Sequence, residues 1–403
     1  MRYVVTGQKL LFESEAFEVI SVEKSIEILQ ALTVIGLDTE TEGFDVYTRN
    51  LLSVQMGNYQ HQIFIDKTTI DIQRYKHILE AEDKLFLLHN AKFDLRFFYH
   101  KRIVIKNVYD SYLVEKLLWL GYPPGYRPMG LDALAYDYLG VKLDKSIRGK
   151  RGLGADVIKY GCDDVKYLEK IKAHQERQLE EKELKVAADI ENQFVKVLAY
   201  VEYCGIKLDR AKWKDKMAKD QEALNNAKDK LDKWIVNKSK QDDSFKKYVF
   251  VEAQGDLFKG FNTEPECIIN WNSPKQLIPL FEELGFNLET KDKATGNKKK
   301  SVDAKILDLQ KDKSELTPIY LDYSKKYKVV TTYGENVLKQ INPISGRIHT
   351  NFNQLMDTGR LSSGGKNTKT KEEYINLQNL PSDIATRSSF VAEKNRVLID
   401  CDY

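Results

Sequence analysis

A short apolar run that ends in two alternating carboxylates is the feature that most limits how this chain can fold. Residues 34–37 read Val-Ile-Gly-Leu, which is typical of a buried strand, and Asp38 and Glu40 follow directly with Thr39 between them. Because successive side chains of a strand point to opposite faces, both carboxylates are predicted to lie on the same face. The carboxyl ends of strands are also where α/β sheets place their ligands.

The first third of the chain alternates between the periodicity of strands and that of helices. A helix is expected from residue 22, with Ser21 as its cap, and a second helix should carry Asp94. The other expected strands are 17–20, 51–56, 62–65 and 84–89. This alternation predicts an α/β domain with a mixed sheet.

From about residue 166 the sequence becomes helical and charged. Residues 166–203 predict a nearly continuous helix, 210–237 a second long helix, and 237–244 a polar linker or tip. The charges on these helices suit either a solvated face or contact with duplex phosphates. The basic loop at 291–300 is a candidate for contact with a nucleic-acid backbone.

Composition narrows the class of protein but does not identify a ligand. The 63 basic and 60 acidic side chains give a net charge of +3, so any basic face must come from local clustering. The four cysteines lack metal-ligand spacing. No run of about 18 apolar residues could span a membrane, and no signal peptide opens the chain, so we expect a reduced, intracellular protein without membrane partners.

Five residues together suggest a site for two divalent cations. They are Asp38, Glu40, Asp94, Tyr160 and Asp164. Hard cations such as Mg²⁺ prefer oxygen ligands, and a pair of them can activate water and stabilise a leaving oxygen. Tyr160 and Asp164 are one helical turn apart, so a phenol could hold the water beside the metal that Asp164 binds. Each residue alone is more simply a surface acid, a cap or a half-buried tyrosine, but the combination predicts phosphodiester cleavage.

The settings of these residues resemble a known family. LDTETEGFD (37–45), HNAKFDLRFF (89–98) and YGCDDVKYL (160–168) are similar to the three motifs of the DEDDy 3′–5′ proofreading exonucleases found in family A DNA polymerases. The resemblance implies a ribonuclease H-like mixed sheet with helices, two Mg²⁺ or Mn²⁺ ions on the four acids, and Tyr160 orienting the attacking water. It also implies that Asn90 supports DNA binding. Asp110 and LDKSIRG (143–149) match further positions of the family.

The second half resembles the thumb and early palm of the same polymerases. The segments in family order are WNSPKQLIPLFEELGF (271–286), YKVVTTYGENVL (327–338), TGRLSS (358–363), NLQNLP (376–381) and VLIDCDY (397–403). By resemblance, Arg360, Gln378, Asn379 and Arg387 would lie along primer–template DNA. Asp402 would be the first of two catalytic aspartates that bind the polymerase metals.

The resemblance implies three domains. They are an α/β exonuclease domain at 1–185, an α-rich connection and thumb at 186–345, and an incomplete α+β palm at 346–403. Residues 364–375 are longer than the family's usual link and predict a flexible surface insertion. Residues 396–402 predict a buried strand that would lack most of its sheet partners. Because the chain stops at the first palm motif, we expect a carboxy-terminal polymerase half supplied as a separate chain or restored by splicing; a gene fragment is the plain alternative.

Three functions remain open from the sequence. The first is a proofreading exonuclease on a polymerase fragment in the cytoplasm of a bacterial cell or a phage-infected host, acting on primer–template DNA and its single-stranded 3′ end. The second is a DNA-binding or assembly module without turnover. The third, a stand-alone DEDD exonuclease, leaves the motifs after residue 190 unexplained. In the first case Phe44, Phe93 and Phe97 are candidates for stacking on bases, although each also suits core packing.

Overall fold

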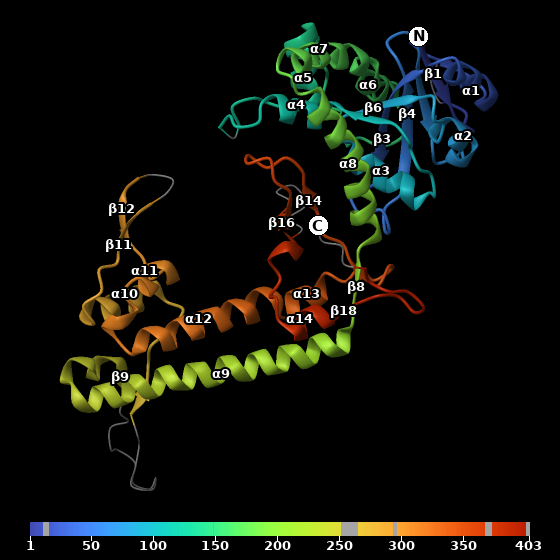
Figure 1. The fold of residues 1–403 in the computed structure, drawn as a ribbon. Coiled ribbons are helices and arrows are strands. Elements are labelled where there is room, and N and C mark those ends of the chain that lie inside the picture. Colours follow the sequence, from blue (N-terminus) through green and yellow to red (C-terminus); the bar gives the residue numbers. More distant parts are fainter. Residues whose placement is uncertain are drawn as a thin grey trace. The chain divides into compact units, whose positions relative to one another are not determined.

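A computed structural model describes residues 1–10, 16–123, 125–147, 149–250, 265–292, 296–366 and 373–399. The chain divides into two compact units, Met1–Lys207 with Ile341–Asn379, and Leu208–Gln340 with Leu380–Tyr403 (Figure 1). The two units are defined by which residues pack against one another. The division into domains at 1–185, 186–345 and 346–403 stays a prediction.

The first unit is built on a seven-stranded mixed sheet, which confirms the predicted α/β class. Its strand order is β2-β1-β5-β4-β3-β6-β7, with β4 antiparallel to its neighbours β3 and β5 and the other pairs parallel. The elements of the sheet and its first helices are β1 (Arg2–Val5), β2 (Glu18–Val19), α1 (Val22–Gln30), β3 (Val34–Thr41), β4 (Leu51–Gly57), β5 (Gln62–Asp66), a 3-10 turn (Ile72–Tyr75), α2 (Lys76–Leu79), β6 (Leu85–Leu88), α3 (Ala91–His100) and β7 (Val108–Asp110). Strands β1 and β7 were not predicted, whereas the predicted cap of α1 is confirmed, since Ser21 Oγ accepts from the backbone N–H of Lys24 at 3.1 Å.

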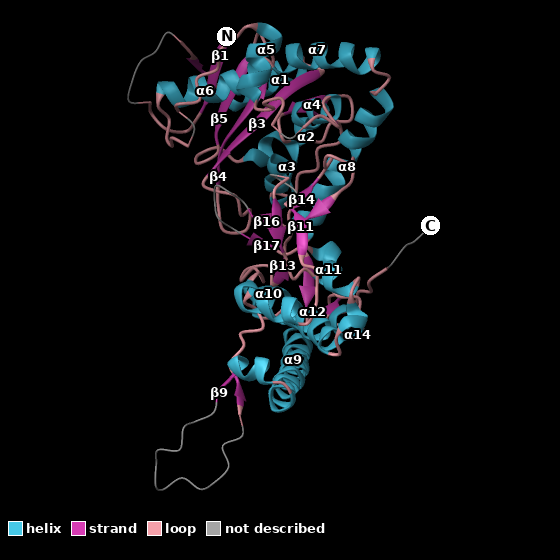
Figure 2. Cartoon of the chain, turned by 90° about the vertical axis from the view of Figure 1, so that its left-hand side faces the viewer, coloured by secondary structure: helices cyan, strands magenta, loops and turns pink. Residues whose placement is uncertain are grey.

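The two faces of the sheet have different covers, as the alternation in β3 requires. Ile35 and Leu37 point into the main core, which also holds residues of α1, α2 and α3. Helix α6 (Ala155–Lys166) contacts β3, β4 and β5 on the other face (Figure 2). There Val4 and Phe64 pack against Ile158. Since Gly36, Asp38 and Glu40 alternate with the core residues, they face α6.

Two glycines let α6 approach the sheet closely. A Cβ atom on Gly36 would lie 2.6 Å from the carbonyl oxygen of Val165, and one on Gly161 would lie 2.9 Å from the side chain of Gln55. Contacts this short force the structure to shift. A side chain at either position would therefore push the helix that carries Tyr160 and Asp164 away from the strand that carries Asp38.

Replacing Gly36 by Ala is expected to lower the free energy of unfolding by about 1 to 3 kcal/mol, because the new methyl group meets backbone atoms. Urea unfolding of the two proteins measures the change. Gly7→Ala is the control, since the nearest atom to its Cβ is Thr69 Cβ at 3.3 Å on the surface. If Gly36→Ala were as stable as Gly7→Ala, α6 would not depend on this close approach.

The remaining helices of the first unit are α4 (Ser111–Leu118), α5 (Leu131–Leu139), α7 (Leu168–Glu181) and α8 (Lys185–Cys204). Helices α7 and α8 divide the nearly continuous helix expected at 166–203. That prediction was wrong at 182–184, where Glu183 adopts a left-handed φ of 58°. The backbone N–H of Leu184 bonds the carbonyl of Leu179 at 2.8 Å, which is the closing bond of a Schellman motif. The turn lets α8 change direction and pack against α3.

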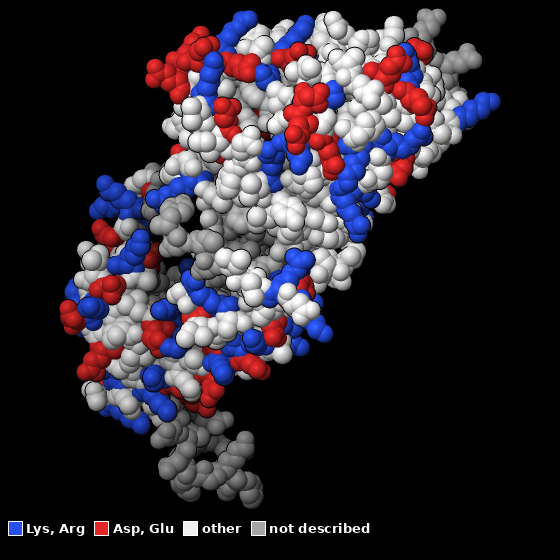
Figure 3. Space-filling model, turned by 45° about the vertical axis from the view of Figure 1, so that its right-hand side comes forward, with Lys and Arg blue, Asp and Glu red and all other residues white. Residues whose placement is uncertain are grey.

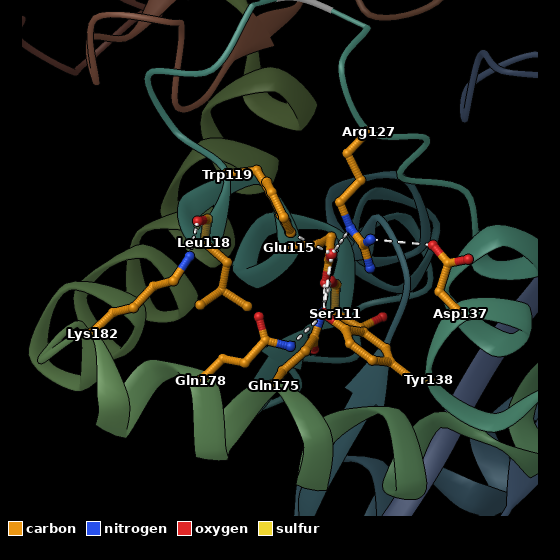
Figure 4. A network of polar contacts seen from close by, with 10 residues as sticks. All are labelled: Ser111, Glu115, Leu118, Trp119, Arg127, Asp137, Tyr138, Gln175, Gln178 and Lys182. Atoms are coloured by element: carbon orange, nitrogen blue, oxygen red, sulfur yellow. Dashed lines mark hydrogen bonds and ion pairs between the residues drawn. The ribbon is translucent and has the colours of Figure 1, made fainter.

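A buried carboxylate ties several of these elements together (Figure 4). Glu115 on α4 is completely buried. It accepts hydrogen bonds from Trp119 Nε1 at 3.0 Å, from Tyr138 Oη at 2.8 Å and from Gln175 Nε2 at 2.8 Å, and it pairs with Arg127. These partners lie at the end of α4, on α5, on α7 and in the loop before α5, so a single side chain fixes four segments.

The segment 341–379 also belongs to the first unit. Its elements are β13 (Arg347–Ile348), β14 (Phe352–Asn353), β15 (Ser362–Ser363), β16 (Gly365–Lys366), β17 (Glu373–Tyr374) and a 3-10 turn (Leu377–Asn379). Lys92 on α3 anchors it, since its ammonium group bonds Asn351 Oδ1 at 3.0 Å and Glu202 Oε1 at 2.5 Å. Strands β16 and β17 form a hairpin inside the predicted insertion, whose residues 367–372 lie outside the described part.

The second unit is mainly helical, as predicted for the thumb. Its elements are α9 (Arg210–Gln241), a 3-10 turn (Asp243–Tyr248), β9 (Val249–Phe250), β10 (Glu266–Cys267), α10 (Pro274–Glu283), β11 (Glu289–Lys291), β12 (Lys298–Lys300), α11 (Ala304–Asp308), a 3-10 turn (Lys311–Lys313), α12 (Leu316–Tyr333), α13 (Glu335–Lys339), α14 (Ile384–Ser388) and β18 (Phe390–Val391). Strand β8 (Ile206–Leu208) leads into it. Helices α9 and α12 pack along each other around Leu231, Trp271 and Phe281.

Two predictions for the second unit are corrected, and a third stays untested. The linker expected at 237–244 is the last turn of α9 followed by a 3-10 turn that Asp242 caps. In the basic segment 291–300, whose residues 293–295 lie outside the described part, Lys298, Lys299 and Lys300 each pair with an acid, and contact with a nucleic-acid backbone stays a prediction. The strand expected at 396–402 is absent from the described residues 396–399, where Val397 and Ile399 are 78% and 80% exposed.

The surface view agrees with the near balance of charges. Basic and acidic side chains are interspersed over the face shown in Figure 3. Within the described part of the chain, no helix combines the length and apolar character that crossing a bilayer requires.

Candidate active site

Three of the predicted metal ligands meet between β3 and α6. Oxygen atoms of Asp38, Glu40 and Asp164 all lie within 4.8 Å of one another. This confirms that the alternating pair of β3 shares one face and that Asp164 comes to it from α6. An all-oxygen set of acidic ligands at this spacing fits a hard divalent cation.

Asp94 lies beside this cluster. It is 3% exposed on α3, and its Oδ1 accepts a 2.5 Å hydrogen bond from the hydroxyl of Thr39. Thr39 lies between the two acids of β3, and its side chain points to the opposite face of the strand. Asp94 therefore contacts β3 from the face opposite to Asp38 and Glu40. The structure thus brings three predicted ligands together and holds the fourth next to them through a threonine that sequence reasoning had not assigned.

Because these carboxylates repel one another, the group as a whole attracts positive charge. Burial, and then the charges of Asp94 and Asp164, raise the pKa of Asp38 well above its usual value. Burial raises the pKa of Asp94 to about 7 and also raises the pKa of Asp164. A divalent cation would remove both the repulsion and the cost of burying these carboxylates.

Tyr160 lies one turn before Asp164 on α6. Burial and the nearby carboxylates raise the pKa of its hydroxyl, so the phenol keeps its proton. Its hydrogen bond in turn lowers the pKa of Asp164. A protonated phenol beside a carboxylate can donate to the carboxylate and accept from a water molecule, and the role of Tyr160 in orienting that water stays a prediction.

Lys145 enters the cluster from the loop between α5 and α6. Its ammonium nitrogen is 2.7 Å from Asp164 Oδ1 and 5.0 Å from the centre of the Tyr160 ring. This residue had not been assigned to the site, although it lies in the LDKSIRG segment that matches the family. Its charge lowers the pKa of both Asp38 and Asp164.

Asp110 holds the start of helix α3 in place. It is 1% exposed, and its carboxylate accepts from the backbone N–H groups of Asn90 and Ala91 at 2.9 and 2.8 Å. Asn90 has a left-handed φ of 71°, so the carboxylate holds the tight turn that starts α3. Since Asp94 is on the first turn of this helix, Asp110 fixes where that carboxylate lies.

A pocket of about 410 Å³ begins at the same turn. Its basic and aromatic lining residues are Phe44, Lys92, Phe93, Arg96, Tyr112, Lys116, Phe352, Lys366 and Tyr374. The Phe44 ring is 40% exposed and meets Phe93 edge-on at 5.8 Å, whereas Phe97 is 1% exposed in the core. Of the three stacking candidates, Phe44 and Phe93 therefore face a cavity, and Phe97 is a core residue.

The predicted polymerase contacts are not among the residues of this cluster. Arg360, Gln378 and Asn379 are exposed in the first unit, and Arg387 is exposed on α14 of the second. Asp402 lies outside the described residues. Their roles on DNA stay predictions.

The raised pKa values predict how metal-free stability depends on pH. A carboxyl whose pKa is raised by folding binds more protons in the native state, so stability falls as pH rises from about 4 towards 7, the range between the usual and folded pKa of Asp94. Divalent cations should cancel this loss. We expect Mg²⁺ to raise the melting temperature more at pH 8 than at pH 5.5, measured against EDTA. An equal or larger increase at pH 5.5 would contradict the assignment.

Comparison with known proteins agrees with the geometry. Residues 18–180 match the family model described as 3′-5′ exonuclease, and residues 256–403 match that of DNA polymerase family A. DNA polymerase I of Caldicellulosiruptor bescii is 44% identical over 140 residues, which are 33% of this chain and 15% of that protein. DNA polymerase I of Borreliella burgdorferi is 26% identical over 410 residues, or 95% of this chain and 40% of that protein.

A solved structure shows the same fold. The polymerase domain of Pol1 from M. smegmatis, in complex with DNA primer-template and dNTP, aligns with 97% of this chain and 59% of that one, with a TM-score of 0.67 and 20% identity. The chain spans 40% or less of the two curated relatives named above. Two family models matched in order, together with relatives aligned along nearly the whole sequence, show that the chain carries a 3′–5′ exonuclease domain followed by a domain of DNA polymerase family A.

Proposed function

We propose that this chain removes nucleotides from the 3′ end of DNA by hydrolysis that depends on two divalent cations, Mg²⁺ or Mn²⁺. The observation that carries the proposal is the meeting of Asp38, Glu40 and Asp164 within 4.8 Å, beside a protonated Tyr160. Asp38, Glu40, Asp94 and Asp164 would hold the metals. When bound, the two cations supply an activated water and charge stabilisation for the leaving oxygen.

The chain's own residues would place the reacting groups. Tyr160 holds the attacking water for attack on phosphorus, and the bond from phosphorus to the 3′ oxygen of the preceding nucleotide breaks. The preceding oxygen leaves with a proton, so each cycle releases a nucleoside 5′-monophosphate. Phe44 and Phe93 offer aromatic surface for the unpaired bases that precede the cut.

For nucleotide addition we propose a joint action with a carboxy-terminal polymerase part, on the same or on a separate chain. Arg360, Gln378, Asn379 and Arg387 would then contact primer–template DNA, and Asp402 would bind a polymerase metal. The match of residues 256–403 to DNA polymerase family A supports this assignment.

The direct test is a time course with the purified chain, Mg²⁺ and a primer–template labelled at the primer's 5′ end, with and without all four nucleotides. Stepwise shortening that stops in EDTA, with mononucleotide products, is the expected result. Shortening from the 5′ end would refute the direction. No shortening in a folded, Mg²⁺-binding sample would favour a DNA-binding or assembly role.

A further inference from the structure

Hydrolysis by two metal ions does not by itself explain why Lys145 lies against the carboxylate cluster. Its ammonium group lies against the cluster of carboxylates, with the nitrogen 2.7 Å from Asp164 Oδ1. The Lys145 side chain is 26% exposed and the Asp164 side chain 7% exposed, so this contact is shielded from water. Shielding strengthens both attraction to the acids and repulsion from any cation that binds them.

A divalent cation on Asp164 and the Lys145 ammonium group would repel each other at this distance. The loop that carries Lys145 has no helix or strand among its described residues, 140–147 and 149–154. A lysine side chain also carries its charge on a flexible four-carbon stem. Lys145 is therefore able to leave Asp164 while staying near the site.

Charge balance indicates where it goes. The acids Asp38, Glu40, Asp94 and Asp164 are balanced by two divalent cations. A phosphodiester then brings one further negative charge to the site. Lysine binds phosphate as a point charge, and one ammonium group restores neutrality.

We propose that Lys145 is a mobile counter-ion of the carboxylate cluster: it holds Asp164 in the metal-free protein, is displaced when divalent cations bind, and then contacts the phosphate of the strand being cut. The last step rests on the proposed nuclease function, whereas the first two do not. Lys145 is in this view both a positioning residue for the empty cluster and a substrate contact.

Lys145→Met separates these roles, with Lys150→Met as a matched control. Lys150 lies on the same loop and pairs with Asp156 at 3.0 Å, but these two side chains are 58% and 46% exposed and outside the cluster. Removing a competing charge should tighten Mn²⁺ binding by about tenfold in isothermal titration or in the electron paramagnetic resonance of free Mn²⁺. The control should bind Mn²⁺ like the unmodified protein.

The metal-free state gives an independent readout. In EDTA, Lys145→Met should melt about 3 °C or more below the unmodified protein, because the acids lose their counter-ion. Saturating Mn²⁺ should abolish this difference. Lys145→Gln repeats both measurements should the methionine variant fail to fold by circular dichroism. Mn²⁺ affinity that is unchanged or weaker in a folded variant would overturn the proposal.

The substrate contact is tested at saturating Mn²⁺ with a 5′-labelled single strand. Lys145→Met should raise KM by about tenfold, as expected for the loss of one charge-assisted contact, and Lys145→Arg should recover most of it. An unchanged KM with tighter Mn²⁺ binding would overturn the phosphate contact. If the unmodified protein shows no nuclease activity while Mn²⁺ binds more tightly to the variant, the proposed function fails and the counter-ion assignment stands.

Discussion

Replacing Asp164 by Asn is expected to lower the rate of 3′-end hydrolysis by at least about 10³-fold. Asp164 is the member of the cluster that α6 contributes, and it also contacts Tyr160 and Lys145. Losing a carboxylate ligand removes several kcal/mol of charge stabilisation in the transition state, and each 1.4 kcal/mol is a factor of ten. The measurement is the initial rate of release of mononucleotides at saturating Mg²⁺.

The adjacent Asp163 provides the matched control. It is on the same helix but turns away from the cluster, since it pairs with Arg2 at 2.9 Å and with Lys159 at 2.8 Å. Asp163→Asn should keep the rate within about twofold, the size of an ordinary surface effect. Equal losses in the two variants would mean that the helix, rather than the ligand, is being disturbed. Full activity in Asp164→Asn would remove Asp164 from the site.

The Asp164 variant should also be at least as stable as the unmodified protein in EDTA. Burial raises the pKa of Asp164, so its charged form weakens the metal-free fold and an uncharged amide does not. Lost activity together with retained stability is the mark of a functional carboxylate. A variant that loses both would instead have a structural role at this position.

Glu115→Ala is expected to have the largest effect on stability, a loss of about 3 to 5 kcal/mol. Glu115 is completely buried, and its removal would leave Trp119 Nε1 and Arg127 Nε without their acceptor (Figure 4). It would also remove one of the two acceptors of Gln175 Nε2. The cost comes mainly from these stranded partners. Native-state hydrogen exchange of the α4 and α7 amides measures it in the unit concerned.

A solvent-exposed glutamate on the same helix as Gln175 is the control. Glu180 pairs with Lys185 at 3.1 Å, but the two side chains are 72% and 54% exposed. Glu180→Ala should change the stability by less than about 1 kcal/mol, because exposed ion pairs contribute little. Similar exchange rates in the Glu115 and Glu180 variants would show that the buried network does not hold these helices together.

Local periodicity was a good guide where one face of an element is buried. The run at 34–37 and the acids after it lie in a single strand, β3, and the four-residue spacing of Tyr160 and Asp164 places both on α6. These predictions succeeded because the alternation of a strand and the turn of a helix are set by the backbone itself. The resemblance to family A polymerases added the function class, which spacing alone left open.

The same reasoning failed where long-range contacts override local pattern. Residues 182–184 look helical, yet Glu183 takes a left-handed conformation that ends α7 and lets α8 reach α3. Residues 237–244 look like a linker because they are polar, yet most of them complete the solvated end of α9. Val397 and Ile399 look like a buried strand, but the described chain provides no sheet around them.

The sequence by itself determined which residue types could form the site and on which elements they lie. Only the tertiary structure decided their distances. Asp38 and Asp164 meet because Gly36 and Gly161 remove the side chains that would hold α6 away from the sheet. The positions of Asp94 and Lys145 also depend on tertiary structure. Thr39 holds Asp94 from the opposite face of β3, and the loop between α5 and α6 brings Lys145 to Asp164. Spacing along the chain fixes direction within one element, whereas the distance between elements depends on every side chain packed between them.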